Sequence, residues 1–123
     1  MAKNKYNMKK IFFIISLLCS LISSAQFNKK TPAEKFEQDL KDNKVTLYIL
    51  GGIASRATDK DADFAEKYHV SYHDFGCLAP PNLNPYMDYN LLAMAYLTRQ
   101  HGREWEKDIR KDILGWNRWK EKS

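Results

Sequence analysis

The chain has 123 residues, of which 44% are hydrophobic and 28% are charged, and its formal net charge is +5. Four of its 20 basic residues are lysines that lie before residue 11, and no acidic residue lies before residue 26. Residues 26–123 are therefore nearly neutral and lack the basic surface of a nucleic-acid-binding domain. We expect one small globular domain and no nucleic-acid partner.

The first 25 residues have the pattern of a secretory signal peptide. The four lysines precede an apolar run over residues 11–22, and the small residues Ser23-Ser24-Ala25 follow it. The run is too short to span a bilayer, which needs about 20 apolar residues. We expect cleavage between Ala25 and Gln26 and export to the periplasm or the extracellular space, with no stable membrane anchor afterwards.

The two cysteines bear on this expectation in different ways. Cys19 lies in the apolar run, but lipidation needs a small residue just before the cysteine and Leu18 stands there. Lipidation and an uncleaved anchor are therefore the weaker alternatives. Cleavage leaves Cys77 as the sole cysteine, so no internal disulfide can form. We expect its thiol to be buried, with a reactive or intermolecularly paired thiol as the alternatives.

An N-terminal helical segment, residues 26–44, comes first in the mature chain. Within it, Thr31-Pro32-Ala33-Glu34 combines a capping box with a proline at the first helical position, which predicts a surface helix over about 32–42. The run Val45 to Leu50 is nearly all apolar and rich in β-branched and aromatic residues. It predicts a strand buried on both faces, closed by Gly51-Gly52.

A helix and a second strand are predicted next. Aspartates at 59, 61 and 63 favour a helix N-terminus, and Phe64, Ala65 and Tyr68 supply its inner face. The run Val70 to Phe75 predicts the second strand. The order strand, helix, strand predicts a right-handed βαβ unit with parallel strands.

A loop over 76–84 leads into a long helix. Asn84 is expected to cap it and Pro85 to begin it, and the helix is predicted to run to about residue 100. Its stretch from Leu91 to Leu97 is apolar all round, which indicates a buried helix packed against the sheet.

The C-terminal part predicts one more helix. Trp105, Ile109 and Ile113 recur every four residues, which predicts a helix over about 103–114 with Glu106 and Arg110 paired on its outer face. The domain is expected to end near residue 119, before a short basic tail, 120–123. The tryptophans at 105, 116 and 119 are expected in the core, with ligand stacking on Trp119 as the alternative. The fold class predicted is α/β: a single small domain with a two-stranded parallel sheet packed by about four helices.

Three patterns typical of metal or phosphate sites fail on spacing. The aspartates at 59, 61 and 63 lack the glycine and glutamate of a calcium loop. His69 and His73, if on one strand, lie roughly 13 Å apart, too far to share one ion. Gly51-Gly52 lacks the further glycines or the lysine of a nucleotide-binding turn. We therefore expect no metal and no cofactor.

The position of a ligand site follows from topology. In an open parallel sheet, ligands bind beyond the carboxyl ends of the strands. The ligand-binding candidates at that edge are Gly51, Gly52, Ser55, Asp74 and Cys77. The same end of the second strand holds the parts of a thiol nucleophile system, since an imidazole and a carboxylate can activate a cysteine. The candidates for that weaker alternative are Cys77, His73 and Asp74.

Several runs of this sequence resemble the FEKKY-domain family, small exported bacterial proteins named after a Phe-Glu-Lys-Lys-Tyr run. The corresponding run is Phe64-Ala65-Glu66-Lys67-Tyr68, in which an alanine intrudes and one lysine is missing. Three further runs look like the family: residues 49–53, 70–77 and 110–115. The resemblance covers about residues 45–119, and it implies no established activity.

The functional expectation is an exported, non-catalytic binding or interaction module, because no catalytic pattern satisfies its spacing. The alternative is a small thiol-dependent or hydrolytic enzyme that uses Cys77. Two strands make a small sheet with an exposed edge, and such an edge can be completed by a second chain. We therefore also predict a homodimer.

Overall fold

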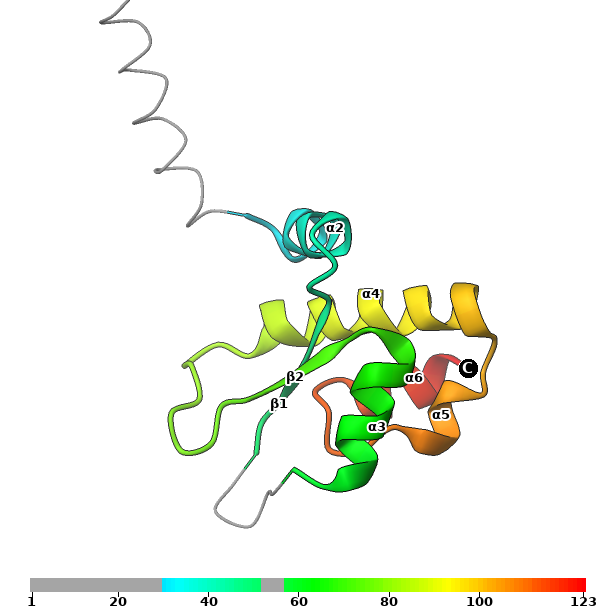
Figure 1. The fold of residues 1–123 in the computed structure, drawn as a ribbon. Coiled ribbons are helices and arrows are strands. Elements are labelled where there is room, and N and C mark those ends of the chain that lie inside the picture. The colour runs from blue at the N-terminus through cyan, green and yellow to red at the C-terminus, as the bar shows by residue number, and fades with distance from the viewer. Residues whose placement is uncertain (1–29, 52–56) are drawn as a thin grey trace, which may run out of the picture. The chain divides into compact units, whose positions relative to one another are not determined.

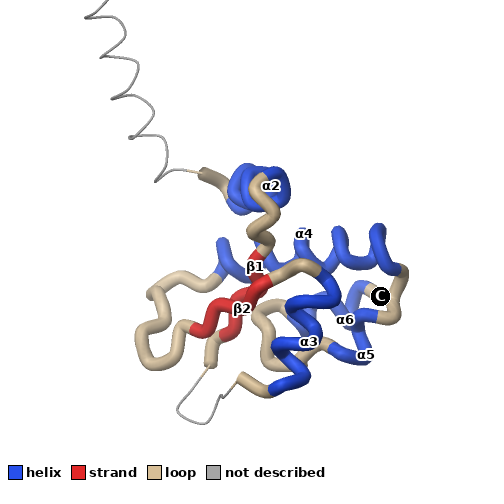
Figure 2. The backbone as a smooth tube through the Cα atoms, in the orientation of Figure 1, coloured by secondary structure: helices blue, strands red, loops and turns tan. Residues whose placement is uncertain are grey.

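A computed structural model describes residues 30–51 and 57–123 of the chain. The predicted signal peptide, its cleavage site, Gly52 and Ser55 lie outside the described residues. The described part is a mixed α/β domain with five helices and one two-stranded parallel sheet (Figures 1 and 2). This confirms the predicted fold class.

Helix α2, Pro32–Lys41, begins as its sequence predicts. The Thr31 hydroxyl accepts a hydrogen bond from the Glu34 backbone N–H at 3.2 Å, and the Glu34 carboxylate accepts one from the Thr31 N–H at 2.9 Å. This capping box satisfies two backbone donors that the helix itself cannot pair. The buried ring of Phe36 then attaches α2 to helix α4 (Asn84–His101) through edge contacts with Tyr89 and Tyr96.

The βαβ unit consists of β1 (Thr46–Ile49), α3 (Asp59–Tyr68) and β2 (Ser71–Asp74). The strands pair in parallel, with Thr46 opposite Ser71 and Ile49 opposite Asp74. The core lies on one face of this sheet, where Leu47 and Ile49 are buried against Phe64 and the helices, while Thr46 and Tyr48 on the other face are only half-buried. Burial of the first strand on both faces was therefore a wrong expectation, because the helices cover only one face fully.

Helix α4, Asn84–His101, is the long buried helix that the sequence predicts, and it runs along the sheet in Figure 1. Its inner residues Tyr89, Asn90, Ala93, Met94 and Leu97 are buried in the core. The predicted cap is wrong: Leu83 occupies the N-cap position without a side-chain hydrogen bond. The Asn82 side chain, two residues before Asn84, instead accepts a hydrogen bond from the Asn84 N–H at 3.1 Å.

The predicted helix over 103–114 does not form. Helix α5 covers only Trp105–Asp108, and Ile109 has an extended backbone with φ −72° and ψ 144°. The chain then returns to the sheet, where Ile113 forms an antiparallel bridge with Ile49. Buried isoleucines four residues apart are compatible with this extended return as well as with a helix, so spacing alone could not separate the two.

Helix α6, Trp116–Lys122, contains most of the predicted basic tail, and the expected domain boundary after residue 119 falls inside this helix. Trp105 is fully buried, and Trp116 and Trp119 are partly buried against the core. The Trp119 indole donates a hydrogen bond to Glu106 at 3.0 Å. These contacts agree with the expected structural role of the tryptophans. None of the helices within residues 30–51 and 57–123 has the length and apolar character needed to span a membrane.

Candidate functional site

The outer edge of β1 is closed by side chains of α4. Asn90 is fully buried, and its amide donates to the carbonyl oxygens of Tyr48 at 2.8 Å and Leu114 at 2.9 Å, while its Oδ1 accepts from the Tyr48 N–H at 2.9 Å. The Leu114 N–H also donates to the Tyr48 carbonyl, at 3.0 Å. Side chains and the returning segment thus complete the hydrogen bonding of this edge in place of a third strand.

Tyr89 extends this closure toward the start of β1. Its hydroxyl accepts a hydrogen bond from the Thr46 N–H at 3.2 Å and donates one to the Asp39 carboxylate at 2.7 Å. Lys35 holds the same buried carboxylate at 2.7 Å. Burial, and next the hydrogen bond to Asp39, raises the pKa of Tyr89, so the phenol remains a proton donor.

The outer edge of β2 differs, because no strand pairs with it among the described residues. The N–H groups of Ser71 and Phe75 donate toward the first strand, to Val45 at 2.9 Å and Ile49 at 3.1 Å. Since donors alternate along a strand in a parallel pair, the N–H groups of Tyr72 and Asp74 face away from it. Ser71, His73 and Asp74 are exposed, so this edge presents backbone groups that an added strand could pair.

Beside this edge, on the half-covered face of the sheet, lies a cluster of rings that we call the aromatic face: Tyr48, His73, Phe75 and Tyr86. Tyr86 and Phe75 have ring centroids 4.9 Å apart, as do His73 and Phe75, and Tyr48 stacks on Phe75 at 5.8 Å. His73 is exposed and the other three are half-buried. Rings held by one another on a surface offer a large contact area at little further cost in conformational entropy.

The carboxyl ends of the strands meet as the topology predicts. Gly51 has a positive φ of 63°, and a Cβ placed on it would lie 1.7 Å from the Asp74 Oδ1. The same oxygen accepts a hydrogen bond from the Gly76 N–H at 2.7 Å. Asp74 therefore covers Gly51 and stabilises the turn after β2. Of the five predicted ligand-binding candidates, Gly51 and Asp74 are in contact, and Gly52 and Ser55 are not described.

Cys77 is exposed, so its predicted burial is wrong. The turn at Gly76, with a φ of 57°, directs the chain away from the sheet into the loop before α4. Its neighbour Leu78 is also 88% exposed. No hydrogen bond joins Cys77 to His73 or Asp74, although the structure describes all three residues. The structure thus places the thiol system's parts on one exposed segment without the contacts that would activate a nucleophile.

The histidine pair is divided between two elements. His69 is the left-handed C-cap of α3, with φ 53°, and His73 lies in β2. Within the described residues, no group of three or more His, Cys, Asp or Glu side chains is arranged to hold a metal ion. Asp61 acts in the capping box of α3 with Thr58, as the helix-capping interpretation predicts.

A polar cluster that the sequence did not predict centres on Arg110. Its guanidinium binds Asp112 through two hydrogen bonds of 2.7 Å and reaches Asp61 at 3.3 Å. Arg110 does not pair with Glu106 as predicted, because the helix that was expected to contain both residues does not form. The hydrogen bonds from Arg110 outweigh burial and lower the pKa of Asp112. Arg110 thereby attaches α3 to the segment that returns to the sheet.

Tyr72 lies against this cluster, with the Arg110 guanidinium 5.9 Å from its ring centroid. Its hydroxyl oxygen is buried and has no hydrogen-bond partner among the described residues, although the nearby Arg110 backbone acts to lower its pKa. Burial, and next the charge of Asp61, raises the pKa of Tyr72. The phenol is therefore held neutral.

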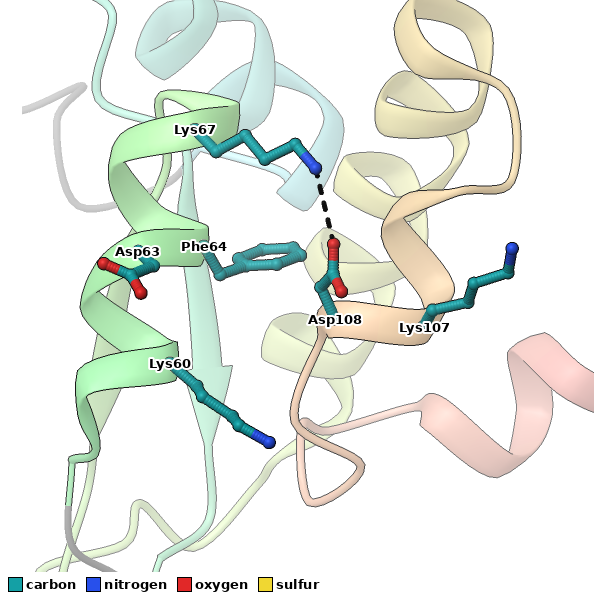
Figure 3. Close-up of a pocket in the computed structure, with 6 residues that line it drawn as sticks. All are labelled: Lys60, Asp63, Phe64, Lys67, Lys107 and Asp108. Atoms are coloured by element: carbon teal, nitrogen blue, oxygen red, sulfur yellow. Dashed lines mark hydrogen bonds and ion pairs between the residues drawn. The ribbon is translucent and has the colours of Figure 1, made fainter.

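A separate cleft of about 350 Å³ lies between α3 and α5 (Figure 3). Phe64 forms its back wall, and its other lining residues are Lys60, Asp63, Lys67, Lys107 and Asp108. Lys67 pairs with Asp108 at 3.5 Å, and its ammonium lies 5.1 Å from the Tyr68 ring centroid. The Tyr68 side chain raises the pKa of Lys67, and Asp108 adds to this, so the ammonium stays charged.

Comparison with family models, with curated proteins and with solved structures found no match to this chain. The site must therefore be interpreted from its own geometry. Two features were not predicted from the sequence: the half-covered face of β1 and the hydrogen bonds of Asn90. Each has a weak signal in the sequence. Tyr48 alternates with aliphatic residues, which indicates a half-covered strand face, and a lone asparagine in an apolar helix indicates a buried polar contact. Neither signal names the partner, which lies 42 residues away for Asn90 and Tyr48.

Proposed function

We propose that this chain is an exported, non-catalytic interaction module of the FEKKY-domain type, which binds its partner through the outer edge of β2 and the adjoining aromatic face. The proposal rests on a difference in hydrogen bonding between the two edges of the sheet. Buried side chains complete β1, whereas no described residue pairs with the outward N–H groups of β2, a strand in which Ser71, His73 and Asp74 are exposed. An unpaired edge beside exposed rings is a template for strand addition.

The partner we propose is a second copy of the chain. A twofold axis at β2 would set the two edges antiparallel, so that each supplies the donors and acceptors that the other lacks. His73 and Phe75 of both copies would then lie on one continuous aromatic surface. Each added ring pair contributes about 0.5–1.5 kcal/mol beyond the burial of its area.

The alternative thiol enzyme has less support. Exposure of Cys77 makes its thiol accessible, but Asp74 is held by Gly76 and does not orient His73. Exposure of Cys77 also offers a second route to dimers, by an intermolecular disulfide. The test of the proposal therefore has to separate strand pairing from thiol oxidation.

The experiment uses the processed chain purified from an exporting bacterial host, with intact mass expected to correspond to a start at Gln26. Size-exclusion chromatography with light scattering at high micromolar concentration should give a dimer, both in reductant and in Cys77→Ser. The variant His73→Lys places like charges near the axis and should shift the protein to the monomer, because charged edges prevent strand pairing.

Gln100→Lys is the matched control, since it adds the same charge at an exposed position of α4 and should leave the dimer intact. A monomer at high micromolar concentration contradicts self-association through β2. A dimer that disappears only in Cys77→Ser or in reductant would assign the association to the disulfide instead.

A further inference from the structure

We infer that the cleft between α3 and α5 is a binding site for a small molecule that carries two or more anionic groups. This inference concerns a surface that shares no lining residue with the β2 edge or the aromatic face, and it does not depend on the proposed function. The residues that define it are Lys60 and Lys67 on α3, Phe64 between them, and Asp108 on α5.

The geometry of α3 brings the two ammonium groups to one side. Lys60 and Lys67 are seven residues apart, or two helical turns, so they lie on the same face with their Cα atoms roughly 10 Å apart along the axis. Figure 3 shows both side chains extending from α3 toward α5, one on each side of the Phe64 ring. Two cations spaced in this way suit two anionic groups on one molecule better than a single small ion.

The charges that could neutralise the cleft are unequally placed. Asp63 points away from α5 in Figure 3, and Lys107 points away from α3. Asp108 alone faces the two inward cations, and it pairs with Lys67 at 3.5 Å. Lys60 has no ion-pair or hydrogen-bond partner among the described residues. The inner cleft thus holds two cations against one anion, although residues 26–123 as a whole are nearly neutral.

The size and wall of the cleft agree with a small organic ligand. Its volume of about 350 Å³ lies in the range of small-molecule sites. Phe64 is 2% exposed, so its ring is fixed and gives the cleft an apolar back. A ligand anion at Lys67 would replace Asp108 as the partner of that ammonium, so Asp108 acts as a competing internal anion.

The test is a titration of the full processed chain with two probes, citrate for carboxylates and inorganic pyrophosphate for phosphates, followed by amide NMR and calorimetry at low ionic strength. We expect saturable binding with shifts at residues of α3 and α5. Lys60→Gln and Lys67→Gln should each weaken binding about fivefold, because each removes one of the two ammonium groups that extend toward α5. Whichever probe binds more tightly identifies the anion chemistry.

Two further variants make the inference specific. Lys107→Gln removes the same charge from the same rim, but its ammonium points away, so it should change affinity by less than about twofold. Asp108→Asn removes the competing anion and should tighten binding, which loss of a merely structural ion pair would not do. Unsaturable binding of both probes, equal losses for Lys60→Gln and Lys107→Gln, or weaker binding in Asp108→Asn would each overturn the inference. Thermal unfolding of each variant verifies that the fold is retained.

Discussion

The two outer edges of the sheet differ in how the rest of the described chain pairs with them. The β1 edge is completed by Asn90, Tyr89 and the segment that ends at Leu114, all of which come from later parts of the sequence. The β2 edge meets no such residue among those described. A few buried polar groups are therefore enough to close one edge of a two-stranded sheet, while the other edge has no strand partner among the described residues.

The largest effect should come from opening the closed edge. Asn90→Ala removes three hydrogen bonds and leaves the Tyr48 N–H and the Leu114 carbonyl without these partners, while the Tyr48 carbonyl keeps the Leu114 N–H. Each unsatisfied buried group costs about 1–3 kcal/mol, so we expect a loss of about 3 kcal/mol in the free energy of unfolding. Urea unfolding followed by circular dichroism measures it.

Asn117→Ala is the matched control, because Asn117 is an exposed asparagine of α6. It should change the free energy of unfolding by less than about 0.5 kcal/mol. Equal stability of the two variants would show that solvent or a rearranged loop can replace the hydrogen bonds of Asn90. The stability of the closed edge would then not depend on Asn90.

The turns that follow the two strands should also differ in how much stability a substitution of their glycine costs, with the larger cost after β1. Gly51 and Gly76 both have positive φ, but a Cβ at Gly51 collides with Asp74, whereas a Cβ at Gly76 meets nothing within 4 Å. Gly76→Ala should therefore cost about 1 kcal/mol, for backbone conformation alone. Gly51→Ala should cost about 2 kcal/mol or more, because a steric clash is added to that strain.

A double-mutant cycle isolates the clash. Asp74→Ala combined with Gly51→Ala should recover part of the loss, while Asp74→Ala combined with Gly76→Ala should show no such recovery. If both glycine variants lose the same free energy of unfolding, the contact between Gly51 and Asp74 is not a constraint on the turn.

The sequence was informative where local patterns decide the structure and silent where distant residues meet. The capping box at Thr31, the parallel βαβ unit and the buried helix α4 follow from local patterns, and all three are confirmed. The helix expected over 103–114 failed because the bridge between Ile113 and Ile49 joins residues 64 apart in the chain, which helical spacing cannot reveal. Contact of Gly51 with Asp74 followed from topology, whereas exposure of Cys77 depended on the direction of one turn.

A further comparison concerns two phenols with buried hydroxyl groups, one near each edge. Tyr89→Phe removes the hydrogen bonds to Thr46 and Asp39 at the closed edge and should cost about 1.5 kcal/mol. Tyr72→Phe removes a hydroxyl that has no hydrogen-bond partner among the described residues, so it should leave stability within about 0.5 kcal/mol of the parent or raise it. Thermal unfolding at neutral pH measures both.

The pH dependence of stability is a second test of the same two phenols, and the direction of the change follows from their raised pKa values. Burial raises the pKa of both phenols in the folded state, so the unfolded chain releases their protons first as the pH rises above about 10. The stability contributed by each protonated phenol is complete below that pH and is lost above it. Each phenylalanine variant should therefore lose less stability than the parent between pH 9 and pH 11. If a variant loses as much as the parent, the phenol that it lacks has the same pKa in the folded and the unfolded chain.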